Sequence, residues 1–61
     1  MFNIYGKMKT EEKYQMMNVS QGHFVTRKIH ASLFSTWEKA DRICNELEIE
    51  NPEYFFEVRS V

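Results

Sequence analysis

The sequence contains a single cysteine, Cys44, so an internal disulfide is impossible. With only two glycines, it has no glycine-rich loop of the kind that cradles phosphate groups. No apolar run approaches the roughly 18 residues of a membrane-spanning segment, and the first residues lack the basic start and continuous apolar stretch of a signal peptide. Because isolated cysteines are typical of a reducing compartment, we expect a soluble cytoplasmic protein.

A chain of 61 residues forms at most one domain, and a domain of this size buries only about 60% of the surface that its unfolded chain exposes. Its stability is then marginal, and domains this small commonly add a disulfide, a metal or a second subunit. A homodimer is the simplest of these remedies here. A hydrophobic content of 43% is too high for a disordered chain.

The hydrophobic pattern predicts an α+β domain of the order β-β-α-β over residues 13–61. Two strands are expected at 14–19 and 24–29 because apolar and β-branched residues are frequent in both. The turn between them contains Gly22, which adopts a positive φ without steric cost. These segments therefore predict a β-hairpin.

A helix is expected to follow the hairpin. Ser35 and Glu38 have the spacing of a capping box at its start, and Pro52 ends it. The apolar residues between these signals recur every three or four positions, which is typical of a helix with one buried face: Trp37, Ala40, Ile43, Cys44 and Leu47. We expect Trp37 to anchor the helix on the sheet. The aromatic residues of 54–58 predict the last strand.

A single helix covers one face of a three-stranded sheet, and the last strand must enter that sheet to bury its aromatic residues. We therefore expect a mixed sheet of strand order 2-1-3. In this arrangement the strand at 54–58 runs antiparallel to the strand at 14–19 and parallel to the strand at 24–29, which it follows through a right-handed crossover. Residues 1–12 are expected to form a flexible leader or an extra edge strand.

Three residues other than carboxylates are candidate ligands for a transition metal: His23, His30 and Cys44. If the two histidines belonged to one continuous strand, their odd offset would direct the imidazoles to opposite faces. Neither has the near spacing of a ligand pair, and Cys44 lies on the apolar stripe, where a thiol behaves as a small hydrophobic side chain. We expect no metal and no cofactor.

Catalytic motifs are absent from the sequence. The serines have no Gly-x-Ser-x-Gly setting, and a domain with one helix leaves little room for the concave site that hydrolytic catalysis needs. We expect that the protein is not an enzyme.

The last strand is the strongest indication of a binding surface. Successive residues of a strand point to opposite faces, so Phe55, Glu57 and Arg59 would share the face of the sheet away from the helix. An apolar patch on that face would mark a contact surface. The alternative is that the apolar residues at 2–5 fold back and cover it.

Charge is distributed unevenly along the chain. Residues 1–37 carry five cations against two acids, whereas residues 38–61 carry three cations against seven acids. Glu46, Glu50 and Glu53 lie around the C-terminal end of the predicted helix, where the helix dipole favours cations. We interpret this acidic group either as a solvated surface or as a second contact face for a basic partner.

The net charge of −1 argues against a dedicated nucleic-acid binder, whose affinity would depend on clustered cations. A weak nucleic-acid binder would use Lys13, Arg27 and Lys28.

Part of the C-terminal half is similar to a known family. The similar residues are Thr36 and Ala40 at the helix start, and Phe56-Glu57-Val58 with Val61 in the last strand. In these positions the chain resembles the T7-type phage inhibitors of bacterial RNA polymerase. The resemblance implies a compact sheet with one helix, in a short, cytosolic, phage-encoded protein that docks on a larger host protein such as transcription or defence machinery. It implies no binding residue, because Arg59 falls at a different place in the strand.

These features together predict a small, non-catalytic accessory or inhibitor module that binds a host protein. Two alternatives stay open. One is a homo-oligomeric structural protein whose uncovered sheet face is the dimer contact. The other is a weak nucleic-acid binder.

Overall fold

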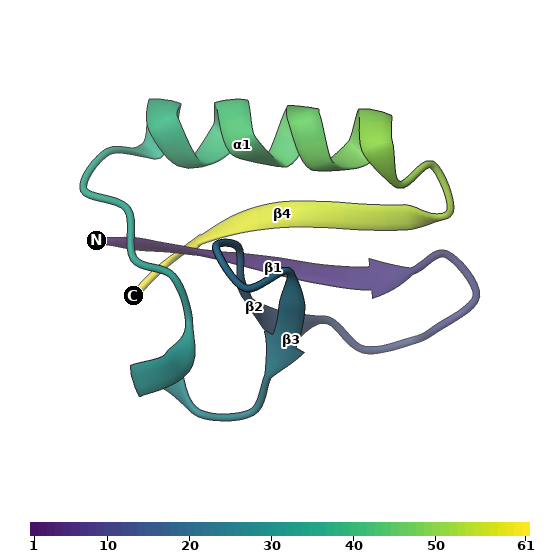
Figure 1. Ribbon diagram of the computed structural model, residues 1–61, viewed down its shortest axis with the longest axis horizontal. Coiled ribbons are helices and arrows are strands. Elements are labelled where there is room, and N and C mark those ends of the chain that lie inside the picture. Colours follow the sequence, from purple (N-terminus) through teal and green to yellow (C-terminus); the bar gives the residue numbers. More distant parts are fainter.

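The computed structural model describes all of residues 1–61. Its elements are, in chain order, β1 (Phe2–Met8), β2 (Gln15–Asn18), β3 (His23–Val25), the 3-10 helix η1 (Lys28–His30), α1 (Trp37–Glu50) and β4 (Tyr54–Ser60). The strands form one four-stranded antiparallel sheet of order β3-β2-β1-β4. Helix α1 packs on one face of this sheet, mainly against β4 and also against β1 (Figure 1). The α+β class with one helix is therefore confirmed.

The expected three-stranded sheet of order 2-1-3 is wrong, because the N-terminal residues supply a fourth strand. β1 lies between β2 and β4, and its ladder with β4 runs without interruption from Phe2↔Ser60 to Met8↔Tyr54. The two chain ends consequently lie close together (Figure 1), where the amide of Val61 donates to the carbonyl of Met1 at 2.9 Å. Residues 2–8 form an interior strand, and not the leader or extra edge strand expected within residues 1–12.

The expected strand directions are also wrong. Because each pair of neighbouring strands is antiparallel, β4 runs in the same direction as β2 and opposite to β3. No parallel crossover is present. Instead α1 and β4 run side by side in opposite directions (Figure 1). The insertion of β1 between β2 and β4 reverses the direction that β4 must take.

The hairpin between β2 and β3 confirms the predicted turn. Asn18 pairs with His23 across it, and Gly22 adopts a φ of 72°. The side-chain oxygen of Asn18 accepts from the amide of Gln21 at 3.0 Å, while its carbonyl accepts from the amide of Gly22 at 2.9 Å. Asparagine commonly fixes a turn in this way. β3 is shorter than expected, since the chain leaves the sheet after Val25.

Helix α1 begins one residue later than the sequence indicated. Thr36 caps it, its hydroxyl oxygen accepting from the amide of Lys39 at 3.3 Å. The expected capping box of Ser35 and Glu38 is therefore wrong. With Thr36 as the cap, the third residue of the helix is Lys39, which has no carboxylate to accept a bond from the amide of the cap. The predicted end is confirmed: the helix stops at Glu50, before Pro52. No helix of the protein is both long enough and apolar enough to cross a membrane.

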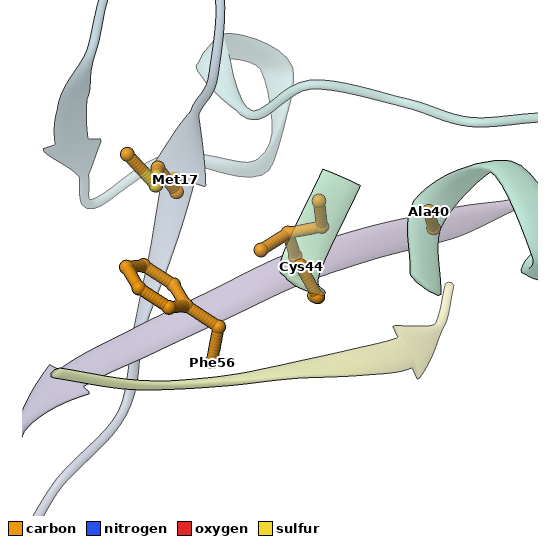
Figure 2. Close-up of a cluster of buried hydrophobic side chains, with 5 residues drawn as sticks. Met17, Ala40, Cys44 and Phe56 are labelled. Carbon is orange, nitrogen blue, oxygen red and sulfur yellow. The ribbon is translucent and has the colours of Figure 1, made fainter. Parts of the chain in front are cut away.

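The core lies between α1 and the sheet. Its five buried residues come from four elements: Ile4, Met17, Ala40, Cys44 and Phe56. Figure 2 shows the Phe56 ring of β4 directed towards Met17 of β2, with Cys44 of α1 near them and Ala40 farther along the helix. The small side chains of Ala40 and Cys44 allow α1 to approach the sheet closely.

Trp37 is not the anchor that was expected. Its side chain is 50% exposed, and it lies outside the core cluster. As the first residue of α1, Trp37 lies at the end of the apolar stripe rather than at its centre, where the small residues pack. The helical spacing placed it on the correct stripe but did not reveal that it lies at the margin of the contact.

The segment 32–34 holds the N-terminal half of β1 in place. Phe2 and Phe34 exchange two backbone hydrogen bonds of 2.9 Å, and the amide of Ser32 donates to the carbonyl of Met17 at 3.1 Å. Asn3 is buried, only 2% exposed, and its side-chain amide donates to the carbonyl of Ser32 at 2.9 Å. These bonds satisfy a buried polar side chain and close the gap where β2 diverges from β1.

Candidate functional site

The face of the sheet away from α1, here called the open face, gathers aromatic and charged side chains. Residues directly opposite each other in an antiparallel ladder share a face, and the ladders pair Tyr5 with Glu57 and with Met16, and Lys7 with Phe55. The intervening residues Ile4 and Phe56 belong to the core. Strand register and ring contacts together assign nine residues to the open face: Tyr5, Lys7, Lys9, Tyr14, Met16, Val25, Phe55, Glu57 and Arg59.

Cations of the open face lie over its aromatic rings. The guanidinium carbon of Arg59 is 4.2 Å from the ring centre of Tyr5 and 5.3 Å from that of Tyr14. The ammonium of Lys7 is 5.4 Å from the ring centre of Tyr14 and 5.8 Å from that of Phe55. Each such contact contributes about 0.5–1 kcal/mol when exposed. The contacts join β1, β4 and the residue before β2 into one patch.

Glu57 adds a single negative charge to this patch. Its carboxylate pairs with the Nε of Arg59. Partial desolvation raises the pKa of the Tyr14 hydroxyl, and the charge of Glu57 raises it further, since both disfavour the phenolate, whereas Arg59 acts in the opposite direction. Tyr14 therefore keeps its proton and presents a hydrogen-bond donor beside a carboxylate.

The predicted contact residues Phe55, Glu57 and Arg59 do lie together on the open face. Phe55 remains 44% exposed. The side chains of Glu57 and Arg59 are exposed to a comparable extent. Phe2 and Ile4 do not cover them, because both pack towards the core, whereas Tyr5 lies beside them on the open face with the guanidinium of Arg59 over its ring. Whether these side chains bind a partner stays a prediction.

The acidic residues predicted as a second contact face lie elsewhere. Glu46 and Glu50 are exposed on α1, on the other side of the sheet from the open face, and Glu53 is exposed in the turn before β4. Glu46 and Glu50 therefore form a surface separate from Phe55, Glu57 and Arg59, whereas Glu53 is only two residues before Phe55 in the chain.

The cations suggested for nucleic-acid binding are not among the residues that form the aromatic and charged patch. Lys13, Arg27 and Lys28 are all exposed, and none of them makes a contact with an aromatic ring. The ring contacts are made by other cations, those of Lys7, Lys9 and Arg59.

Sequence reasoning missed Tyr5, Lys7 and Tyr14 as members of the patch. Their positions depend on β1 entering the sheet, and β1 was not placed there. The alternation of apolar Phe2 and Ile4 with the residues between them was the signal that could have found this strand.

Two hollows lie in the surface, and the second borders the open face at Val25. One, of ≈ 110 Å³, is lined by Met17, Phe24 and Tyr54 among others, and it is smaller than the roughly 300 Å³ at which typical ligand sites begin. The other, of ≈ 520 Å³, is polar and open to solvent, and both His23 and His30 line it. These histidines do not share a strand, since β3 ends before the second one.

No group of three or more His, Cys, Asp or Glu side chains could hold a metal ion together. Cys44 is 3% exposed, and burial raises its pKa to about 11, with the charges of Asp41 and Glu48 adding to the effect. A thiol that stays protonated is a poor nucleophile and a poor metal ligand.

Comparison of the chain with models of protein families, with curated proteins and with solved structures gave no match. The resemblance to the T7-type phage inhibitors of bacterial RNA polymerase therefore stays a prediction based on the residues quoted for it.

Proposed function

We propose that the protein is a non-catalytic protein-binding module and that the open face is its contact surface. The observation that carries this proposal is the group of Tyr5, Tyr14, Phe55 and Arg59 on the face of the sheet away from α1. Aromatic residues and arginine are enriched at the centres of protein interfaces, where they contribute most of the binding energy.

The charges of the open face indicate what the partner surface carries. Lys7, Lys9 and Arg59 outnumber the single carboxylate of Glu57. A complementary partner would present apolar side chains against Phe55 and carboxylates around them, since complementary charges favour the correct partner and speed association. The contacts between cations and rings already order these side chains, which lowers the entropic cost of binding.

Such a module acts by occupying a surface of a larger protein. Inhibition or adaptor activity on a host protein follows from this occupancy without any chemical step, in keeping with the phage family that the C-terminal residues resemble. A cytoplasmic location belongs to the same proposal.

A weak nucleic-acid binder is the second candidate, and one specific observation favours it. Aromatic rings interleaved with cations on an open sheet are the kind of surface on which single-stranded bases stack. Binding of this kind weakens steeply as the salt concentration rises, because counterions are released from the phosphates. A fluorescent single-stranded oligonucleotide titrated at two salt concentrations tests it.

The experiment for the main proposal is affinity capture from bacterial lysate by the tagged protein, with the bound proteins identified and quantified by mass spectrometry. A variant with Phe55→Ser and Glu57→Lys removes the most exposed ring and the lone carboxylate of the open face. A Glu46→Lys variant makes a charge change of the same size on α1 and serves as the control. We expect a specific protein to be recovered with the wild type and the control and lost with the open-face variant.

Equal recovery with the open-face variant, shown by circular dichroism to be folded, would refute this contact surface. Loss with the Glu46→Lys variant alone would point to the acidic side of α1 instead.

A further inference from the structure

β4 is an edge strand whose outer side has no partner in the sheet. It is seven residues long, and its ladder with β1 contains no bulge. Natural edge strands are usually shortened, bulged, or protected by proline or an inward-pointing charge, because a free edge pairs readily with another chain. The other edge of the sheet, β3, is only three residues long.

The backbone groups on the free side can be assigned from the hydrogen bonds to β1. Lys9 donates to the carbonyl of Glu53, and Val61 donates to the carbonyl of Met1. Because bonded positions alternate along an antiparallel ladder, the odd-numbered residues of β4 bond to β1. The even-numbered residues Phe56, Val58 and Ser60 therefore direct their amide and carbonyl groups outwards.

We propose that two copies of this chain pair through their β4 edges, antiparallel, about a two-fold axis at Val58. This register places Val58 opposite Val58 of the second copy and Phe56 opposite its Ser60. The outward amide and carbonyl groups of one copy then lie opposite those of the other. The two four-stranded sheets then become one continuous sheet, and the open faces of both copies join on the same side.

Charge complementarity selects this register among those that match outward groups. With the axis at Val58, Glu57 lies opposite Arg59 of the second copy, and Arg59 opposite its Glu57. A shift that places the axis at Glu57 sets the two Glu57 carboxylates against each other, and a shift to Phe56 sets Glu57 against Phe55. Opposite charges directly across an antiparallel pair stabilise it, and like charges destabilise it.

The side chains that would form these pairs are available. Glu57 uses only Oε2 in its bond to the Nε of Arg59 of the same copy. A carboxylate accepts several hydrogen bonds and a guanidinium donates five, so both side chains can make further bonds beside this one. Both side chains are partly exposed, Arg59 to 45% and Glu57 to 39%, so the pairs can form without rearrangement of the core.

Charge exchange at these two positions tests the proposal on the protein alone, with no need for an identified partner. Sedimentation is measured from micromolar to millimolar concentration. We expect the wild type to dimerise, and Glu57→Arg and Arg59→Glu each to raise the dissociation constant about tenfold or more, since like charges then face each other.

Combining the two substitutions should restore the dimer in two ways. In an equimolar mixture of the single variants, the copy with Glu57→Arg carries cations at both positions and the copy with Arg59→Glu carries carboxylates at both. Opposite charges then face each other across the mixed dimer. The variant that carries both substitutions in one chain should also dimerise, because the exchange only reverses the direction of each pair.

Val58→Pro provides an independent test, because it removes an outward amide while leaving the ladder with β1 intact. A folded Val58→Pro variant should be monomeric. Val25→Lys is the matched control, since it alters the open face on β3, at the opposite edge of the sheet, and should leave the dimer unchanged.

A wild type that stays monomeric at every concentration would overturn the proposal. So would a dimer that the single charge variants leave intact, or one that Val25→Lys abolishes, because the contact would then be the open face. The result for the dimer does not decide whether the open face binds another protein.

Discussion

Replacing Gly6 by alanine tests how tightly the core is packed. Gly6 lies opposite Phe56 in the ladder between β1 and β4. A Cβ atom at this position would be 2.7 Å and 2.8 Å from two carbons of the Phe56 ring and 3.0 Å from a carbon of the Phe24 ring. Optimal contacts between carbon atoms are about 3.5–4.0 Å, so the Phe56 ring must move by about 1 Å.

That movement is costly because the ring cannot shift alone. The Phe56 ring stacks on Tyr54, with ring centres 5.9 Å apart, and Tyr54 stacks on Phe24 at 6.0 Å. Overpacking of a core typically costs about 1–3 kcal/mol. Removing a glycine also reduces the entropy of the unfolded chain, which offsets about 0.4–1 kcal/mol. We therefore expect Gly6→Ala to lower the free energy of unfolding by about 1–2 kcal/mol, a large part of the roughly 3–5 kcal/mol that a core of this size supplies.

Urea unfolding followed by far-ultraviolet circular dichroism measures this change. Adding Phe56→Leu to Gly6→Ala removes ring atoms at the point of contact, so the effects of the two substitutions should be strongly non-additive. Gly22→Ala is the contrasting control, because its Cβ would meet nothing within 4 Å but its φ of 72° is unfavourable for alanine. A Gly6→Ala variant as stable as the wild type would refute the close approach of β1 to the Phe56 ring.

Three further predictions concern α1 and the core. Trp37→Ala should leave the domain folded, because the side chain is 50% exposed, whereas Phe56→Ala should cost about 3–5 kcal/mol and abolish the folded circular dichroism spectrum; equal effects would contradict the core described here. In urea unfolding, Thr36→Ala should lower the free energy of unfolding by about 1 kcal/mol and Ser35→Ala by less than about 0.5 kcal/mol. A larger loss with Ser35→Ala than with Thr36→Ala would instead support the capping box of Ser35 and Glu38. The pKa of Cys44, raised by burial from 9.0 to about 11, makes the thiolate unfavourable in the folded state. The resulting stability is complete below pH 9 and is lost as the pH rises towards 11, by up to about 3 kcal/mol, and Cys44→Ala should lack this component of the fall.

The sequence predicted those elements whose pattern is local. The hairpin followed from Gly22 and its flanking residues, the end of α1 from Pro52, and the last strand from its aromatic residues. The start of the helix was displaced by one position, because Ser35 and Thr36 are both good caps and only the fold decides which residue is the last one in extended conformation.

β1 could not be placed from the sequence because its stability depends on distant partners. Asn3 looks solvent-exposed in the sequence, but it is buried through its bond to Ser32. Gly6 weakens the strand pattern, yet only glycine leaves space for the Phe56 ring. Without β1 the strand order and directions could not be correct.

The candidate site was predicted in part for the same reason. Strand alternation alone placed Phe55, Glu57 and Arg59 on one face. Tyr5 and Tyr14 join them through the register between strands, which local sequence does not encode.

The most direct test of the open face as a contact surface is hydroxyl-radical footprinting of the protein, free and bound to the protein that it captures. The rings of the open face, Tyr5, Tyr14 and Phe55, should lose reactivity on binding, whereas Trp37, half-exposed on α1, should keep it and serves as the internal control. Protection of Trp37 with unchanged reactivity of Phe55 and Tyr5 would contradict the account and move the contact surface to the helical side of the molecule.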